Sequence, residues 1–129
     1  MEIILKPIGV VHSPFKTLDQ TPRWGTLTDA TGEIEIFPQY EEGLFRIEEY
    51  RSIEVLFYFH ESRRDILKVT PPHDKKERGV FASRAPVRPN PIGLTQMDLL
   101  EKKGRFLKVK NIDMLDGTPV LDIKQHSPE

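Results

Sequence analysis

The apolar residues of this chain occur in short runs, and the strongest is IEVLFYFH, Ile53 to His60. Eight residues rich in β-branched and aromatic side chains are typical of a buried central strand. No run in the 129 residues approaches the length of about 18 that a membrane-spanning helix needs. Charged residues make up 30% and hydrophobic residues 37%, as in an ordinary polar-surfaced protein. We therefore expect a single domain, 1–129, built from short strands.

Period-two alternation and turn residues predict the other elements. GEIEIF, Gly32 to Phe37, places two isoleucines opposite two glutamates. PQYEEGLFRIEEYRS, 38–52, can form one short helix, and the segments His12–Leu27 and His60–Lys76 are predicted loops. This pattern is typical of a mainly all-β domain, either a small barrel or a sandwich. The remaining predicted strands are Ile3–Val11, RGVFASR at 78–84, Leu94–Leu100 and Phe106–Ile112 as a hairpin around Gly104, and Val120–Ile123.

FASRAPVRPNPIGLT, Phe81 to Thr95, is predicted to be a stiffened loop. Its three prolines fall within six residues, and each fixes φ and removes a backbone donor, which excludes a helix interior or a central strand. The loop displays Arg84, Arg88 and Asn90. Guanidinium groups held in place before binding suit the recognition of a carboxylate or phosphate. The alternative is that both arginines fold back on backbone carbonyls and hold the shape of the loop.

Charge is unevenly distributed, although the net charge of the chain is −1. Between Ser62 and Asn90 there are eight basic and three acidic residues, a local charge of +5. A basic segment can steer a polyanion toward the protein, and a solvated loop with scattered charges is the simpler alternative. The basic side chains are Arg63, Arg64, Lys68, Lys75, Lys76, Arg78, Arg84 and Arg88.

Several familiar kinds of site are absent from the sequence. The chain has no cysteine, which excludes disulfides, thiolate catalysis and cysteine-ligated zinc. HESRR at His60 lacks the second histidine of a zinc protease, because Arg64 stands there, and no metal site is predicted. The eight glycines form neither a P-loop, a G-x-S-x-G elbow nor the Rossmann fingerprint. The first residues, MEIILKPIGVVHSP, do not resemble a signal peptide, and we expect a cytoplasmic protein.

Two polar pairs remain as candidate binding groups. His60 and Glu61 follow the most apolar strand, where they either line the mouth of a pocket or cap the strand end through a hydrogen bond. DMLDGTP places Asp113 and Asp116 around an Asp-Gly turn. One carboxylate either stabilises this turn or accepts hydrogen bonds from an amine or a ribose.

Five blocks of the sequence resemble the TsaA-like (TrmO) family of S-adenosylmethionine-dependent tRNA N6-adenosine methyltransferases. They are IGVVHSPFK, GEIEIFPQYEEGL, LFYFHE, GVFASRAPVRPNPIGLT and DMLDGTPVLDIK, in family-like order over nearly the whole chain. The resemblance implies a closed or partly open β-barrel with one or two short helices. It also implies homodimers that bind the methyl donor near the subunit interface. The implied substrate is the threonylcarbamoyl-modified adenosine just 3′ of the tRNA anticodon, methylated on N6.

The resemblance assigns donor contacts by position, and the chain departs from the family in two places. Glu61 stands where the family commonly has glutamine, which adds a charge beside the donor. Familiar members have DIKPY where this chain has Gln125 and His126 after DIK, and some of them carry a further C-terminal domain. If that domain helps to bind tRNA, it affects tRNA affinity and substrate choice. The implied donor-binding residues are Gly25, Thr26, Leu27, His60, Glu61, Arg84, Leu94, Asp113, Met114, Leu115 and Asp116.

Methyl transfer from a sulfonium mainly requires alignment of the donor, the methyl carbon and the acceptor. The lone pair of adenine N6 is delocalised and its proton becomes acidic only as the new bond forms, so hydrogen-bond acceptors can replace a strong base. We expect Asn90 and Pro91 to supply these acceptors, by loose analogy with the Asn/Asp-Pro-Pro-aromatic segments of other amino-methyltransferases.

Arg84 is expected at the charged end or ribose of the donor, and Arg88 at a tRNA phosphate or the carboxylate of the modified base. The expected tRNA-backbone contacts are Arg63, Arg64, Lys75, Lys76 and Arg78.

Two other classes of function fit the same residues. A donor-binding regulatory module would need no catalytic base, and none is obvious in the sequence. A methyltransferase for a small molecule or a protein would be compatible with the net charge of −1.

Overall fold

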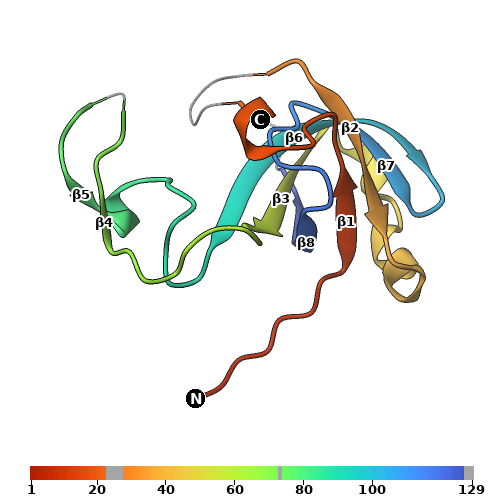
Figure 1. Cartoon of the computed structure of the whole chain (residues 1–129). Helices are drawn as coiled ribbons and strands as arrows, with labels where there is room; N and C mark the ends of the chain where they lie inside the picture. The colour runs from red at the N-terminus through yellow and green to blue at the C-terminus, as the bar shows by residue number, and fades with distance from the viewer. Residues whose placement is uncertain (23–27, 73, 127–129) are drawn as a thin grey trace.

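The computed structural model describes residues 1–22, 28–72 and 74–126, and this part of the chain is mainly β-structure (Figure 1). Six strands form a closed antiparallel barrel in the order β1, β2, β7, β6, β3 and β8, and β8 pairs again with β1. The predicted all-β barrel is therefore confirmed, in its closed form. The bounds are β1 Gly9–His12, β2 Thr31–Ile36, β3 Ser52–Tyr58, β6 Ile92–Lys103, β7 Phe106–Lys110 and β8 Pro119–Gln125.

The strands close around one core because alternate side chains point inward. In β2, Ile34 and Ile36 are buried while Glu33 is exposed, as the alternation predicted. β3 pairs with β6 on one side and β8 on the other, which confirms its central position. Its Ile53 and Val55 are fully buried. The other core residues with no exposed surface are Val11, Met97, Leu107, Val109, Ile112 and Val120.

β6 is the longest strand, with twelve residues, and it joins two parts of the barrel wall. Residues 92–98 pair with β3, whereas residues 98–103 pair with β7. The register shifts between Leu99 and Glu101, which is an irregularity of the bulge type. A bulge bends a strand and increases its twist, so one continuous strand can pass around the barrel. The start of β6, at Ile92 to Thr95, lies at the barrel mouth nearest the site described below.

Between β3 and β6 the chain leaves the barrel and forms a lateral arm, residues 60–91, seen in green at the left of Figure 1. The arm contains the two-residue strands β4 Lys68–Val69 and β5 Arg78–Gly79, which pair antiparallel, and the 3-10 turn η4 Val80–Ala82. Leu67 and Phe81 on the arm remain 60% and 79% exposed. The sequence predicted a loop over His60–Lys76 and a strand over 78–84, and both predictions are wrong in part because these short elements interrupt them.

Two further predictions need correction. The N-terminal strand predicted over Ile3–Val11 begins only at Gly9, and residues 1–7 are exposed. Pro7 has no N–H to donate to a ladder, which explains the late start. The predicted helix over 38–52 consists of two 3-10 helices, η2 Pro38–Leu44 and η3 Ile47–Glu49.

Phe45 and Arg46 separate these two helices: Phe45 is the C-cap residue of the first, and Arg46, with a left-handed φ of 70°, is the N-cap residue of the second. One more 3-10 turn, η1 Leu18–Gln20, follows β1. Among the described residues, no helix is long and apolar enough to cross a membrane.

Candidate functional site

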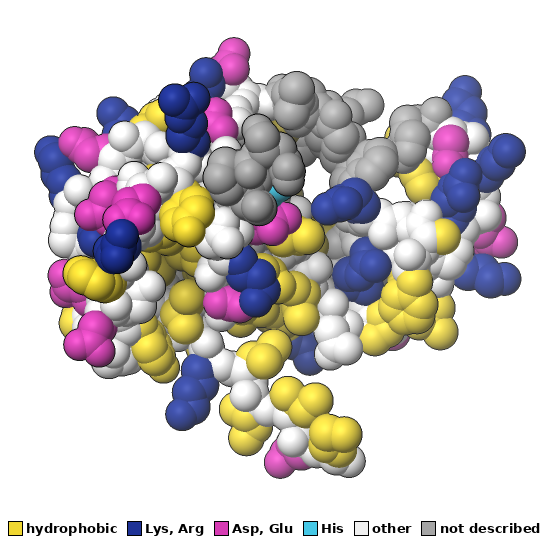
Figure 2. All heavy atoms as spheres, turned by 180° about the vertical axis from the view of Figure 1, so that it is seen from behind, with side chains coloured by type: hydrophobic (Ala, Val, Ile, Leu, Met, Phe, Trp, Pro, Cys, Tyr) yellow, Lys and Arg dark blue, Asp and Glu magenta, His cyan; other side chains and the backbone are white. Residues whose placement is uncertain are grey.

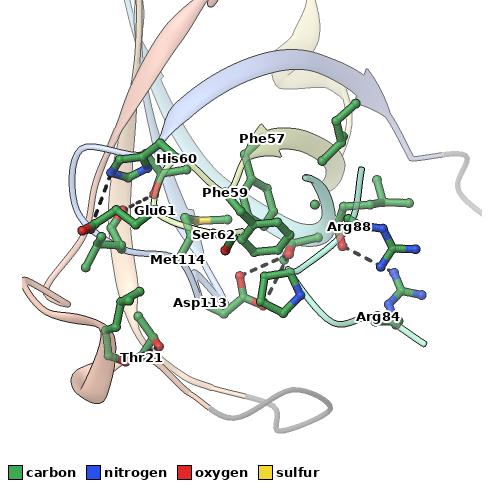
Figure 3. Close-up of a pocket in the computed structure, with 18 of the residues that line it drawn as sticks. Thr21, Phe57, Phe59, His60, Glu61, Ser62, Arg84, Arg88, Asp113 and Met114 are labelled. Atoms are coloured by element: carbon green, nitrogen blue, oxygen red, sulfur yellow. Dashed lines mark hydrogen bonds and ion pairs between the residues drawn. The ribbon is translucent and has the colours of Figure 1, made fainter. Parts of the chain in front are cut away.

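A cavity lies where the arm meets the mouth of the barrel (Figure 3). Its volume is about 650 Å³, within the range of roughly 300–1,000 Å³ that is typical of small-molecule sites. Four segments line it: the end of β3 with the loop that follows, the base of the arm, the start of β6, and the turn before β8. Residues close to η1 complete the wall. Segments distant in sequence therefore converge on one hollow.

Two phenylalanines form an apolar wall of this cavity. Phe57 and Phe59 meet edge to face, with ring centroids 5.1 Å apart and planes at 71°. Gly93 of β6 makes room for them, since a Cβ at Gly93 would lie 2.6 Å from Phe57 Cε2 and 2.8 Å from Phe59 Cζ. An aromatic wall of this kind suits a flat ring such as a purine.

Asp113 provides a carboxylate within this largely apolar hollow. The Thr95 hydroxyl donates to it, at 3.1 Å from Oδ1 and 3.3 Å from Oδ2. Burial raises the pKa of the Asp113 carboxyl, while the hydrogen bond from Thr95 and the charge of Arg84 oppose that rise. Figure 3 shows Asp113 among the side chains that line the cavity. Asp113 is therefore a partly desolvated carboxylate that accepts hydrogen bonds from the Thr95 hydroxyl and from its own backbone N–H.

Asp116, three residues later, has a structural task and is not among the cavity-lining residues. Its Oδ1 accepts the backbone N–H of Ser13 at 2.9 Å, and Lys16 Nζ lies 3.1 Å from its Oδ2. Burial pushes the pKa of Asp116 upward, but the Ser13 N–H and Lys16 outweigh it and hold the pKa below its usual value. Of the two alternatives for the DMLDGTP turn, Asp116 matches stabilisation of the turn and Asp113 faces the cavity.

The two arginines of the proline-rich loop also differ. Arg88 Nη1 donates to the carbonyls of Ala85 at 2.7 Å and Ser83 at 3.3 Å, so this side chain holds the loop in the way that the simpler alternative described. Arg84 is exposed and only its Nη2 approaches a carbonyl, that of Leu94 at 3.5 Å. Both arginines line the cavity. Arg84 therefore has more donors available for a ligand.

Most of the other predicted donor-binding residues are brought together here. His60 and Glu61 line the cavity, with His60 Nε2 3.9 Å from Glu61 Oε2 and the Glu61 side chain 54% exposed. Leu94, Met114 and Leu115 also line it, and Met114 and Leu115 are buried. Gly25, Thr26 and Leu27 lie outside the described residues, so their role remains a prediction.

Asn90 and Pro91, the predicted acceptors, are not among the cavity-lining residues. Asn90 is exposed, and its carbonyl accepts the N–H of Ile92 at 2.7 Å. Pro91 is buried, and its carbonyl accepts the N–H of Phe59 at 2.7 Å. Their catalytic role stays a prediction, and in this structure the Pro91 carbonyl is already paired.

The basic residues predicted to hold tRNA lie on the arm, but several are paired with acids of the same segment. Arg63 forms two hydrogen bonds with Asp65, and Arg78 Nε lies 2.6 Å from Asp74 Oδ2. The Arg64 guanidinium lies 5.2 Å from the centre of the Tyr58 ring. Lys75 and Lys76 are exposed.

The sequence did not single out several residues of the cavity. Phe57, Phe59, Gly93 and Thr95 were assigned only to strands or to the end of a motif. The alternation within IEVLFYFH places Phe57 and Phe59 on the same side as the inward-facing Ile53 and Val55, and that spacing was the available signal. In residues 1–22, 28–72 and 74–126 no group of three metal-binding side chains occurs.

Comparison with known proteins gives consistent results. The family model described as the tRNA-methyltransferase O N-terminal domain matches residues 10–129. An S-adenosyl-L-methionine-binding protein of Archaeoglobus fulgidus is 54% identical over 127 residues, covering 98% of this chain and 91% of the relative. The tRNA (adenine(37)-N6)-methyltransferase of Escherichia coli is 36% identical over 132 residues, covering 94% of this chain and 56% of that enzyme.

Solved structures give the same answer for the fold. A crystal structure of TrmO from Pseudomonas aeruginosa has a TM-score of 0.79 and 34% identity to this chain, covering 99% of it and 57% of the solved chain. Another TrmO crystal structure has a TM-score of 0.81 and 38% identity. This chain thus spans little more than half of those longer proteins. By its sequence blocks, its closed barrel and these matches, the chain belongs to the family of tRNA-methyltransferase O N-terminal domains.

Proposed function

We propose that this chain is an S-adenosylmethionine-dependent methyltransferase that acts on N6 of threonylcarbamoyl-adenosine next to the anticodon of tRNA. The observation that carries the proposal is the cavity at the junction of barrel and arm. It combines an aromatic wall, a partly buried carboxylate and two guanidinium groups, and it opens beside a basic arm. Relatives of the chain carry names that include S-adenosyl-L-methionine binding and tRNA methylation.

The residues of the cavity fit S-adenosylmethionine chemically. Its adenine ring matches the Phe57–Phe59 wall, its carboxylate matches the free donors of Arg84, and its cationic groups match the cavity carboxylates. Bound there, S-adenosylmethionine would supply an electrophilic methyl group carried on a sulfonium. The protein residues that would hold it are His60, Glu61, Arg84, Leu94, Asp113, Met114 and Leu115, with Gly25, Thr26 and Leu27 as further predicted contacts. Asp116 would act indirectly, by fixing the turn.

In this proposal the arm holds the tRNA. Dark blue Lys and Arg side chains gather over it, at the right of Figure 2. Cationic side chains that neutralise phosphates release counterions, so they give strong binding at low salt without reading sequence. Arg88 Nη1 already donates to two backbone carbonyls. Arg88 would therefore contact the modified base or a phosphate through its other guanidinium nitrogens. Such a protein would act in the cytoplasm, where tRNA is modified.

The proposal includes a homodimer, which exposed apolar side chains support. The N-terminal residues Met1, Ile3, Ile4 and Leu5 are 56% to 113% exposed, and the arm exposes Leu67 and Phe81. Isolated apolar side chains on a surface are ordinary, but clusters of them usually mark an interface. Sedimentation velocity on the whole chain is expected to give a dimer that Ile4→Ser or Phe81→Ser weakens. A monomer at micromolar concentration would contradict this part of the proposal.

The experiment that tests the function compares two tRNA substrates. The purified chain is incubated with S-adenosylmethionine labelled in its methyl group and with tRNA that is either unmodified or threonylcarbamoylated at the adenosine 3′ of the anticodon. We expect label in the modified tRNA only, at N6 of that adenosine. Label in neither tRNA, together with calorimetric binding of S-adenosylmethionine, would replace the enzyme by a donor-binding module. That second candidate is favoured by the name of the Archaeoglobus fulgidus relative, of which 91% is covered.

A further inference from the structure

Two buried hydroxyl groups hold the turn before β8. Among the described residues, Ser13 and Thr118 are the only buried residues with a polar side chain, at 5% and 3% exposure. Ser13 Oγ donates to the carbonyl of Met114 at 2.7 Å, and Thr118 Oγ1 donates to the carbonyl of Leu115 at 2.5 Å. Because a buried hydroxyl costs free energy unless it is hydrogen-bonded, these bonds fix two adjacent carbonyls of one turn.

Ser13 makes further contacts that join its own segment to the same turn. Its backbone N–H donates to Asp116 Oδ1 at 2.9 Å, and its Oγ accepts the N–H of Phe15 at 3.1 Å. The carbonyl of Phe15 in turn accepts the N–H of Asp116 at 2.7 Å. Two segments that are about 100 residues apart in the sequence are thus held together through Ser13.

Both of these segments line the cavity. The turn contributes Met114 and Leu115, and the segment that begins at Ser13 continues to Leu18 and Thr21 on another wall. Ser13 itself is not among the lining residues. It can therefore act on a ligand only through the positions of the two walls. Walls that are fixed before binding reduce the entropy that binding costs.

We propose that Ser13 is a positioning residue for S-adenosylmethionine, which fixes two walls of the donor cavity without touching the donor. This inference rests on the donor site of the proposed function. It gives a role to contacts between two sequence blocks, because Ser13 belongs to IGVVHSPFK whereas Met114 and Asp116 belong to DMLDGTPVLDIK. Without the hydroxyl, the Met114 carbonyl and the Phe15 N–H lose their partner, and fewer molecules hold the arrangement that fits the donor.

The first test uses Ser13→Ala, which removes the hydroxyl but keeps the backbone N–H that binds Asp116. Calorimetry should give a Kd for S-adenosylmethionine that is higher by about tenfold or more, because the fraction of binding-competent molecules falls. The methylation rate at saturating donor should stay within about threefold of the wild type, since bound donor restores the walls. A Kd within about threefold of the wild type would overturn the inference.

Val109→Ala is the control for a general loss of stability. Val109 of β7 is fully buried in the barrel core and does not line the cavity. A large-to-small substitution there lowers stability without changing the two walls, so its Kd for S-adenosylmethionine should stay within about threefold of the wild type. If Val109→Ala weakens donor binding as much as Ser13→Ala does, Ser13 has a merely structural role and the inference fails.

The second test needs no variant and measures amide hydrogen exchange in the wild type. The Phe15 N–H binds Ser13 Oγ, and Phe15 does not line the cavity. A donor that requires fixed walls must also stabilise this contact, so saturating S-adenosylmethionine should slow exchange at Phe15 by about tenfold or more. The Phe37 N–H, which binds the Ile8 carbonyl at the other ends of β1 and β2, should change by less than about threefold. Unchanged exchange at Phe15, or equal slowing at both amides, would contradict the inference even if Ser13→Ala does not fold.

The results also separate this inference from the proposed function. If the wild type methylates the tRNA but Ser13→Ala keeps its donor affinity, the inference fails and the proposed function stands. If the wild type shows the expected Kd and exchange effects but labels neither tRNA, the proposed enzyme fails and the role of Ser13 stands. A wild type that does not bind S-adenosylmethionine overturns both.

Discussion

Glu35 of β2 is held between two basic side chains on the outside of the barrel. Arg105 Nη1 donates to its Oε2 at 2.7 Å, and His12 Nε2 donates to its Oε1 at 2.8 Å. The hydrogen bond from Arg105, followed by that from His12, lowers the pKa of the Glu35 carboxyl. Because β1 and β2 are neighbours and Arg105 lies in the turn before β7, these bonds join three consecutive segments of the barrel wall.

A lowered pKa in the folded state makes stability depend on pH with a defined sign. The stability that Glu35 contributes is present above its unfolded pKa, near 4.3, and is lost as pH falls through the lower folded value. We therefore expect urea unfolding of Glu35→Gln to differ most from the wild type at neutral pH, and the two curves to converge between about pH 4 and pH 2. Glu33→Gln is the matched control, because Glu33 is an exposed glutamate of the same strand. A constant difference at all pH values would contradict the assignment.

The same residue type serves different purposes elsewhere in the chain. Asp113 and Asp116 are three residues apart and equivalent in the sequence, yet one lines the cavity and the other fixes a turn through Ser13 and Lys16. Sequence spacing predicts that both lie near a turn. Only the position of Thr95, 18 residues upstream on β6, shows which carboxylate is the enclosed one. The difference between the two aspartates depends on a contact between segments that are distant in the sequence, β6 and the turn before β8.

At the scale of elements, the close approach of β3 and β6 shapes the cavity. Gly93 and Phe57 are directly paired partners, and the absence of a side chain at Gly93 leaves room for the Phe57 and Phe59 rings. An alanine there would push backbone or rings apart, because the contacts at 2.6 and 2.8 Å are shorter than carbon atoms allow.

Gly93→Ala should therefore lose both stability and ligand affinity. We expect a destabilisation of about 1–3 kcal/mol, as for other overpacked cores, and a loss of S-adenosylmethionine affinity of at least about tenfold. Urea unfolding and calorimetry measure the two effects. Gly43→Ala is the control, since a Cβ on Gly43 of η2 would meet nothing within 4 Å. Unchanged affinity in Gly93→Ala would mean that the aromatic wall does not contact the ligand.

The elements that the sequence predicted well are those with a strong period. The alternation in β2 and the apolar run of β3 both appear where they were expected, because a two-residue period and a buried face are local properties. The arm was less predictable, since β4 and β5 have only two residues each and depend on pairing across residues 70–77. The register shifts in the β6–β7 and β3–β8 pairings are likewise not indicated by any local pattern in the sequence.

At the scale of the whole molecule, the basic residues of the arm lie on the side of the barrel where the cavity is found. The arm projects from the barrel on the side opposite to β7 (Figure 1) and carries most of the local excess of positive charge. Two of its guanidinium groups are paired with carboxylates of the same segment, Arg63 with Asp65 and Arg78 with Asp74, and are therefore less available to bind phosphate. The exposed Lys75 and Lys76 then become the strongest candidates for phosphate contacts.

The salt dependence of tRNA binding can test this arrangement. If Lys75 and Lys76 each neutralise a phosphate, the double variant Lys75→Gln/Lys76→Gln should reduce the slope of log K against log[salt] by about 1.4–1.8, because each phosphate contact contributes about 0.7–0.9. The control is Lys103→Gln/Lys108→Gln, which removes the same charge at exposed positions of the β6–β7 hairpin. Both doubles change the net charge equally, so a steering effect of total charge would lower the two slopes alike. A reduction confined to Lys75→Gln/Lys76→Gln would instead locate the bound phosphates on the arm, beside the cavity that receives the base.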